Sequence, residues 1–428
     1  MKIKTAKMDY EDVLKLPQPE HIKPKRPNKF FRIMLKVLSA ADLKKVNFRY
    51  TQKGIDKLPK DVPCLYLMNH SSFTDLKIAS SVIYPKPFNI VCTSDGFVGK
   101  EGFMRMIGCI PTKKFVSDSV LVRDMIYAVK KNDTSVLMYP EASYSFDGTA
   151  TTLPKSLGKC LKLLSVPVVM IRTHGSFLRD PLYNNLQLRK VDVSAEIEYV
   201  LTPDDIAEKS VDELNEILNN LFTFDNFRWQ QENKIKIDEP FRADFLNRVL
   251  YKCPACGSEG KTVGKGTTLT CKNCGKTYEL TEDGFMKATA GKTEFDHIPD
   301  WYKWERECVK KELLDGTYKL DTDVEIHMMV NTDCIYDVGL GHLTHTTEGF
   351  HLTGCNGKLD YSQKPISSYS LYSDYYWYEI GDMICIGGND ALYYCFPKGE
   401  GDIVAKTRLA TEELYKITKE RKNKALKS

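Results

Sequence analysis

The sequence predicts a mixed α/β fold in which a largely parallel sheet is flanked by helices, followed by a small cysteine-rich module and a β-rich C-terminal region. Three observations support this prediction. Short apolar strands alternate with amphipathic helical stretches up to about residue 205, two Cys-x2-Cys pairs follow, and short alternating runs separated by turn signals fill residues 317–396. Alternating strands and helices are typical of sheets covered by helices, whereas consecutive short strands indicate a β-sandwich or barrel.

Length and composition limit the classes of protein to consider. The 428 residues are enough for two or three domains, and contents of 42% hydrophobic and 28% charged residues are ordinary for a globular protein. A net charge of +4 is too small to indicate nucleic-acid binding. No apolar stretch approaches the ~20 residues that span a bilayer, and the first residues lack the apolar core of a secretory signal. The thirteen cysteines suit a reducing compartment, so we expect a cytoplasmic protein.

Residues 1–48 are predicted to form a basic amphipathic N-terminal segment, in which Asn28 caps a helix over residues 29–45. Its apolar side is expected to contain Phe31, Met34, Leu35, Leu38 and Ala41. At a membrane, the residues expected to enter the lipid interface are Phe30, Phe31, Met34, Leu35 and Leu38, and those expected to meet anionic headgroups are Lys25, Arg26, Lys29, Arg32 and Lys36. Such a helix can lie on an anionic membrane surface. We therefore expect peripheral attachment to the inner face of the cell membrane. Packing of the same face on the next domain remains the alternative, since both arrangements share one periodicity.

Residues 49–249 are predicted to form the α/β domain. Buried strands are expected at residues 65–68, 135–139, 166–171 and 191–201, and helices from about residue 73, over 118–131 and over 156–164. In such sheets the reactive side chains gather where strands end. The strand at 65–68 runs into Asn69 and His70, and the strand at 135–139 runs into Pro140 and Glu141.

His70 and Asp75 are the candidate catalytic pair. The imidazole lies at a strand end, and the carboxylate about one helical turn later can accept a hydrogen bond from one ring nitrogen. That bond fixes the tautomer and leaves the other nitrogen able to take a proton from a hydroxyl. A histidine satisfied by a neighbouring side chain without catalytic function is the structural alternative.

Two further segments accompany this pair. Gly108–Lys114 opens a strand and ends in two cations, and Pro140–Ser145 follows a buried strand. In order and spacing, residues 50–205 resemble the glycerolipid acyltransferase superfamily, the lysophosphatidic acid acyltransferases in particular, whose blocks run Asn-His-x4-Asp, Gly-x-x-Phe-Ile-x-Arg, Phe-Pro-Glu-Gly-Thr-Arg-Ser and Val-Pro-Val. The resemblance implies an O-acyltransferase of phospholipid biosynthesis. It would move a fatty acyl group from acyl-CoA or an acyl-carrier-protein thioester to a lysophospholipid, with 1-acyl-sn-glycerol-3-phosphate as the first acceptor to test.

The same resemblance implies which residues would bind substrate: Asn69, Lys113, Lys114, Glu141, Ala142, Ser143 and Tyr144. The chain departs from the family pattern at Lys114 and Tyr144, which stand where the family has Arg, and at Ala142, which stands where it has Gly. Lysine and tyrosine lack the two-pronged donor fork by which arginine binds phosphate. A non-phosphate acceptor and a catalytically impaired lipid- or acyl-carrier-binding protein are therefore the alternatives.

Residues 250–285 are predicted to form a zinc ribbon. Cys253, Cys256, Cys271 and Cys274 form two Cys-x2-Cys pairs separated by fourteen residues, with a glycine after each pair. Four thiolates at this spacing suit a closed structural zinc site. A redox-active dithiol would need a thioredoxin-like context, which is missing, and the scattered lysines here do not indicate nucleic-acid binding. Flanking strands are expected at residues 267–270 and 277–280.

Residues 298–428 are predicted to be a β-rich C-terminal domain. A helix is expected at 298–314, strands at 324–330, 342–345, 350–353, 375–380, 383–386 and 391–396, and a terminal helix at 411–425. Turn signals such as Asn356-Gly357 separate the strands, which favours a small β-sandwich or barrel.

Overall fold

The computed structural model describes residues 2–116, 118–399 and 401–425, which divide into two compact units. One contains residues 20–181 and 187–229, and is called the α/β unit below. The other contains the described residues among 2–19, 182–186, 230–399 and 401–425, and is called the β-rich unit. This division is coarser than the four segments expected from the sequence, which remain a prediction.

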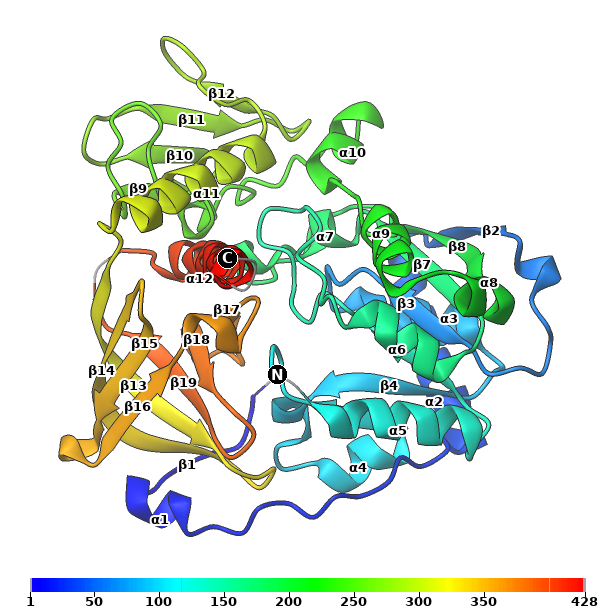
Figure 1. The fold of residues 1–428 in the computed structure, drawn as a ribbon. Helices are drawn as coiled ribbons and strands as arrows, with labels where there is room; N and C mark the ends of the chain where they lie inside the picture. The colour runs from blue at the N-terminus through cyan, green and yellow to red at the C-terminus, as the bar shows by residue number, and fades with distance from the viewer. Residues whose placement is uncertain (1, 117, 400, 426–428) are drawn as a thin grey trace. The chain divides into compact units, whose positions relative to one another are not determined.

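The α/β unit is built on a seven-stranded sheet in the order β2-β8-β7-β3-β6-β4-β5. Figure 1 labels its strands β2, β8, β7, β3 and β4. All neighbouring pairs are parallel except β7 and β8, so the predicted mixed, largely parallel sheet is confirmed. The strands are β2 (Arg49–Lys53), β3 (Leu65–Met68), β4 (Phe88–Thr93), β5 (Cys109–Thr112), β6 (Ser135–Met138), β7 (Val168–His174) and β8 (Ser194–Leu201).

Helices cover both faces of this sheet because its central strands are apolar on both sides. In β3, Leu65 and Leu67 pack in one cluster with α5, α6 and α9, while Tyr66 and Met68 pack in another with α2 and α3. This continuous apolar run is what a buried parallel strand requires. The helices of the unit are α2 (Lys29–Lys45), α3 (Thr74–Ile83), α4 (Glu101–Met106), α5 (Ser119–Lys130), α6 (Leu157–Leu164), α7 (Ser176–Arg179), α8 (Pro203–Glu208) and α9 (Val211–Leu221).

Helix α2 spans the predicted residues, and Asn28 Oδ1 accepts the Phe30 N–H at 3.0 Å as its N-cap. Of the residues predicted to face lipid, Phe30 and Leu38 are exposed, whereas Phe31, Met34 and Leu35 are half-buried, and Phe31 packs against the core. Two basic side chains also serve packing: Arg32 donates to the Pro85 carbonyl, and Lys36 lies 4.0 Å from the Tyr84 ring centre. The exposed apolar stripe keeps two of the predicted residues and adds Ile33 and Val37: Phe30, Ile33, Val37 and Leu38 are 66%, 41%, 64% and 64% exposed.

The β-rich unit contains an eight-stranded sheet in which β16-β15-β14-β13-β19-β18-β17 are consecutive and β1 joins β14. Its strands are β1 (Thr5–Lys7), β13 (Leu320–Met329), β14 (Ile335–Thr346), β15 (Gly349–Gly354), β16 (Leu359–Gln363), β17 (Tyr372–Trp377), β18 (Gly381–Gly387) and β19 (Leu392–Pro397). The predicted strands are therefore present. Their backbone pairing gives a single sheet that runs from β16 to β17, so neither two facing sheets nor a closed barrel is confirmed.

A four-stranded antiparallel sheet carries the cysteine pairs in the same unit. Its order is β12-β11-β10-β9, with β9 (Thr262–Lys265), β10 (Thr268–Cys271), β11 (Thr277–Leu280) and β12 (Met286–Ala288). The unit's helices are α1 (Tyr10–Leu14), α11 (Ile298–Asp315) and α12 (Val404–Ala425), and α10 (Asn226–Glu232) spans the change from one unit to the other along the chain. Helix α12 begins seven residues before the predicted start, because its first two turns are buried rather than amphipathic.

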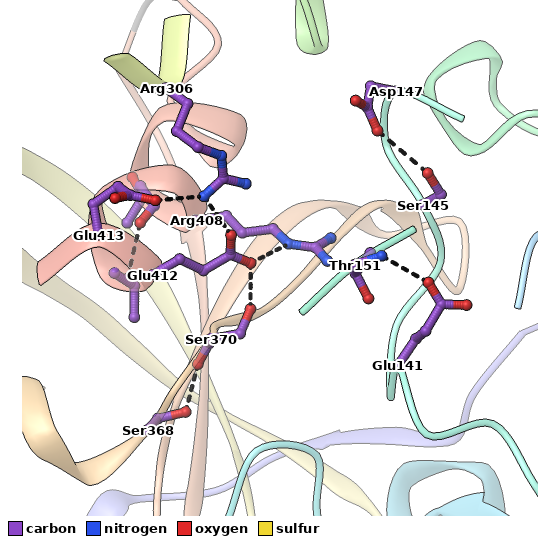
Figure 2. A network of polar contacts seen from close by, with 12 residues as sticks. Glu141, Ser145, Asp147, Thr151, Arg306, Ser368, Ser370, Arg408, Glu412 and Glu413 are labelled. Atoms are coloured by element: carbon purple, nitrogen blue, oxygen red, sulfur yellow. Dashed lines mark hydrogen bonds and ion pairs between the residues drawn. The ribbon is translucent and has the colours of Figure 1, made fainter. Parts of the chain in front are cut away.

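Figure 2 shows the buried ion network that joins α11 and α12. Glu412 Oε2 lies 2.7 Å from Arg306 Nη1, and its Oε1 accepts from Ser370 Oγ at 2.7 Å and lies 3.4 Å from Arg408 Nε. Burial by itself would raise the pKa of Glu412, but Arg306 and Arg408 hold that pKa at about 2. The pair of helices is thus linked by a carboxylate that stays ionised.

In the described part of the chain, no helix is both long enough and apolar enough to cross a bilayer.

Candidate active site

The strand β3 delivers His70 to the C-terminal edge of the parallel sheet, and helix α3 begins four residues later. Between them the chain makes a tight turn around one carboxylate oxygen. Asp75 Oδ2 lies 3.1 Å from His70 Nδ1 and accepts the backbone N–H groups of Ser71 at 2.7 Å and Ser72 at 3.0 Å. The predicted contact between His70 and Asp75 is therefore present.

This contact settles which ring nitrogen is available for chemistry. An ionised carboxylate can only accept hydrogen bonds, so a neutral His70 carries its proton on Nδ1 and leaves Nε2 with a free lone pair. Asp75 is fully buried, whereas the His70 side chain is 21% exposed. The arrangement is that of a general base whose tautomer is fixed by a buried carboxylate on the side away from solvent.

Glu141 holds the backbone of His70 in place. It follows β6, the parallel neighbour of β3, and its side chain is fully buried. Its Oε2 accepts the His70 N–H at 3.1 Å, and its Oε1 accepts the Thr151 N–H at 2.8 Å, a contact drawn in Figure 2. Both oxygens are bonded to the chain itself, so the geometry gives Glu141 a positioning function.

Asn69 fastens the other side of the same turn. Its Oδ1 accepts from Thr173 N at 2.8 Å and lies 3.2 Å from Thr173 Oγ1, on the neighbouring strand β7. The Asn69 side chain is fully buried and continues the pairing of β3 with β7 where the backbone ladder ends. The substrate contacts predicted for Asn69 and Glu141 remain predictions, and both side chains already have partners inside the protein.

Two tyrosines stack on the His70 ring. The ring centres of Tyr139 and Tyr144 lie 4.3 Å and 4.1 Å from it, with interplanar angles of 29° and 28°. Two six-membered rings cannot share one face of an imidazole at these distances, so they cover opposite faces. Phe73, which is 54% exposed, lies 5.9 Å from Tyr144. Only the edge of the imidazole is left to meet a substrate.

The surroundings of His70 keep it neutral. Burial lowers its pKa below the usual 6.5, Asp75 acts in the opposite direction, and the positive charge of Lys114 lowers the pKa further. The net pKa is below 6.5, so the imidazole is largely unprotonated at neutral pH and can accept a proton.

The remaining predicted site residues lie on two loops at this edge. Lys113 and Lys114 follow β5 and are partly buried. Ala142 adopts a left-handed backbone conformation, with φ of 56°, where the related pattern has Gly, and its N–H donates to the Tyr139 carbonyl at 3.0 Å. An alanine in this conformation is strained by roughly 1 kcal/mol. Ser143, the next residue of the loop, is fully buried.

The four cysteines form a separate cluster in the β-rich unit. Their sulfur atoms all lie within 4.8 Å of one another, with Sγ distances of 3.8 Å from Cys253 to Cys274 and 3.7 Å from Cys256 to Cys271. Zinc–sulfur bonds of about 2.3 Å in a tetrahedron put the sulfurs about 3.8 Å apart, so the cluster fits the ion that the spacing predicts.

The two cysteine loops have the same backbone. Gly257 and Gly275 have φ of 75° and 74°, and each donates its N–H to the carbonyl of the first cysteine of its pair, at 2.8 Å and 2.9 Å. This left-handed conformation favours glycine, as the sequence pattern indicates.

Sequence analysis did not single out Tyr139, Thr173 or Thr151. Tyr139 is the last residue of a predicted strand and directly precedes Pro140 and Glu141. Its position therefore indicates that an aromatic side chain lies at the edge of the sheet that carries His70. Thr173 also lies near the end of a predicted strand, but no sequence pattern predicts the hydrogen bonds of Thr173 and Thr151, which join residues about 100 and 10 positions apart.

Comparison with known proteins identifies relatives of the α/β unit. Residues 49–173 match the Acyltransferase family. A chloroplastic 1-acyl-sn-glycerol-3-phosphate acyltransferase of Brassica napus is 29% identical over 136 residues, which cover 29% of this chain and 37% of that protein. The chain thus spans little more than a third of that relative's length.

Among solved structures, the 1-acyl-sn-glycerophosphate acyltransferase PlsC of Thermotoga maritima is similar at 15% identity. The similarity covers 47% of this chain and 79% of that one, with a TM-score of 0.38. At this TM-score the similarity by itself establishes no common fold.

We predict that NMR titration will give His70 a pKa below 6.5. Substitution Lys114→Met should raise that pKa, because a neighbouring positive charge is removed, and Asp75→Asn should lower it, because the stabilising carboxylate is lost. His342, which contacts Asp321 and Asp323 near the surface, provides an internal reference whose pKa should exceed 6.5. A His70 pKa above that of His342 would contradict the burial argument.

Proposed function

Because residues 49–173 form a domain of the glycerolipid acyltransferase superfamily, we propose that the chain transfers a fatty acyl group from a thioester to a hydroxyl of a lysophospholipid. The donor would be acyl-CoA or an acyl carrier protein, and the first acceptor to test is 1-acyl-sn-glycerol-3-phosphate. The observation that carries the proposal is the contact of His70 Nδ1 with buried Asp75 at 3.1 Å, at the end of a parallel strand.

In the proposed reaction, His70 Nε2 takes the proton from the acceptor hydroxyl as its oxygen attacks the thioester carbonyl. The carbon–sulfur bond breaks, an ester forms, and the imidazolium returns the proton to the departing thiolate. Asp75 stabilises the imidazolium while it exists. No acyl-enzyme is required, since the thioester is already activated. Glu141 and Asn69 keep the ring in position through the backbone on either side of it.

Two features bear on the acceptor. Lys113 and Lys114 bring positive charge to the edge of the sheet, which suits a phosphate-bearing acceptor. Tyr144, where the related pattern has Arg, places a neutral aromatic ring against the base. This contact favours a second candidate, an acceptor whose headgroup near His70 is uncharged.

The cluster of four cysteines supports a structural zinc ion in the β-rich unit. Cys253, Cys256, Cys271 and Cys274 would hold it, and the ion would supply folding free energy rather than reactivity, because four protein ligands leave no open position.

The outward stripe of α2 supports docking on a membrane, and we propose that it binds the inner face of the cell membrane. Phe30, Ile33, Val37 and Leu38 would enter the interface. Lys25 and Lys29 are exposed and can meet anionic headgroups, whereas Arg26 donates to the Asn132 carbonyl and Arg32 to the Pro85 carbonyl. Hydrophobic contact should therefore outweigh charge in holding the protein.

The catalytic proposal predicts that purified protein, offered a labelled acyl thioester and a panel of lysolipids, forms an esterified lipid detectable by mass spectrometry. Substitution His70→Ala should lower the rate by roughly 10²–10⁴, the usual contribution of general-base catalysis. His21→Ala is the matched control, because His21 Nε2 also contacts a buried aspartate, Asp124 at 2.9 Å. Near-normal transfer by His70→Ala would contradict the mechanism.

The same assay distinguishes the acceptors. For a phosphorylated acceptor, Lys114→Ala should raise KM more than it lowers kcat, because the lost interaction is shared by the ground state and the transition state. If Lys114→Ala leaves phosphorylated acceptors unaffected while Tyr144→Ala alters turnover, the uncharged acceptor is the correct one.

For the cysteine cluster we predict one zinc per chain by elemental analysis, lost on Cys253→Ser or Cys271→Ser with destabilisation of the β-rich unit. Substitution Cys308→Ser, a half-buried cysteine on α11 outside the cluster, is the control. Immediate loss of acyl transfer on chelation, with circular dichroism unchanged, would instead make the metal catalytic.

For the membrane, we predict that Val37→Ser/Leu38→Ser weakens binding to vesicles containing anionic lipid by at least roughly 10-fold, since each exposed side chain contributes about 1 kcal/mol or more. Leu163→Ser on α6, also an exposed leucine of this unit, should have no effect. Raising the salt should weaken binding further, by about 1 kcal/mol per basic residue at the surface. Unchanged binding by the double variant would place the anchor elsewhere.

A further inference from the structure

Behind the turn that carries His70 and Asp75 lies a buried ion pair that sequence analysis did not anticipate. Arg179 ends α7, and Asp180 follows it directly. Arg179 Nη1 lies 3.3 Å from Asp180 Oδ2, and the two residues are only 9% and 2% exposed. Removing two charges from water costs free energy that the attraction between them often does not offset. The further contacts of this ion pair therefore indicate what function it serves.

One such contact is made with the turn between His70 and Asp75. Arg179 Nη1 also donates to Thr74 Oγ1 at 3.2 Å. The Thr74 N–H in turn donates to Ser72 Oγ at 3.0 Å. Burial raises the pKa of Asp180 to about 7, although the positive charge of Arg179 acts in the opposite direction. Ser72 and Thr74 are themselves buried, at 1% and 2% exposure. Arg179 therefore holds Thr74 directly, and Thr74 is bonded to Ser72, so the ion pair is joined to the turn between His70 and Asp75.

The orientation of Asp75 depends on this turn. The hydrogen bonds to His70, Ser71 and Ser72 all reach the single oxygen Oδ2, while in the described residues the buried Oδ1 has no hydrogen-bond partner. The hydrogen bonds from Ser71 and Ser72 tie the direction of the carboxylate to the backbone of the turn. A shift of that backbone would move Asp75 Oδ2 away from His70 Nδ1.

We propose that Arg179 and Asp180 are positioning residues that hold the turn from Ser72 to Thr74, and through it the Asp75 carboxylate, in the geometry that fixes the Nδ1–H tautomer of His70. The inference deepens the proposed function and rests on it for its effect on turnover. Its effect on the tautomer does not depend on any activity.

The test compares wild type with Asp180→Asn and with Arg179→Met/Asp180→Leu. The single variant keeps the side-chain shape but removes the charge that faces Arg179. The double variant removes both buried charges together, so that neither is left unpaired, which guards against simple unfolding. Asp124→Asn is the matched control, because Asp124 is also a buried aspartate of the α/β unit with a raised pKa due to burial, and its partner His21 lies outside the site.

Imidazole ¹⁵N NMR at pH 8, where Asp180 is ionised, gives the tautomer of His70 directly, with the signal assigned from His70→Ala. We expect a single Nδ1–H tautomer in wild type and in Asp124→Asn, and a mixture of tautomers in both variants of the pair. With acyl thioester and lysolipid, kcat should fall roughly 10-fold or more with KM within about twofold, as for misplacement of a catalytic group.

A wild-type tautomer together with wild-type kcat in the double variant would overturn the proposal, because the pair would then serve only folding. A mixed tautomer in the variants of a protein that shows no acyl transfer would uphold the positioning function and reject the proposed activity. The two failures are therefore distinguishable.

Discussion

The site depends on one constraint: the polar side chains that fasten the C-terminal ends of β3, β6 and β7 are buried and must find their partners within the protein. The chain meets this constraint by bonding side chains to neighbouring backbones. Asn69 reaches Thr173 on β7, and Glu141 reaches the N–H of His70 from the end of β6. An unsatisfied buried group of this kind would cost about 1–3 kcal/mol. The same hydrogen bonds therefore stabilise this edge of the sheet and hold the imidazole in place.

The chemistry of His70 results from opposing effects in this setting. Burial and Lys114 favour the neutral ring, while Asp75 favours the charged one, and burial prevails. The stacked rings of Tyr139 and Tyr144 contribute to that burial and also restrict approach to the edge of the imidazole. A base that is neutral at rest, yet backed by a carboxylate that stabilises its protonated form, suits a reaction in which a proton is taken up and then returned.

Different contacts hold the elements of the β-rich unit together. Its helices α11 and α12 are joined by Glu412 with two arginines, and the cluster of four cysteines links two loops that share one backbone conformation. The buried ion pairs of Glu412 yield little net free energy, because removing the charges from water offsets their attraction. The apolar faces of the strands, with the fully buried Trp301 and Tyr394, remain the main source of its stability.

The sequence by itself determined the features that are local. Periodicity located α2, β3, α5 and β6 to within a residue or two, the Asn28 cap and the cysteine-loop glycines followed from backbone preferences, and the His-x4-Asp spacing brought His70 to Asp75. Only the tertiary structure decided the face that α2 buries, the start of α12, and the contact of Arg179 with a turn about 105 residues away. Those outcomes depend on which surfaces pack together in the folded protein. The periodicity of the sequence is compatible with several such packings, so it does not select one.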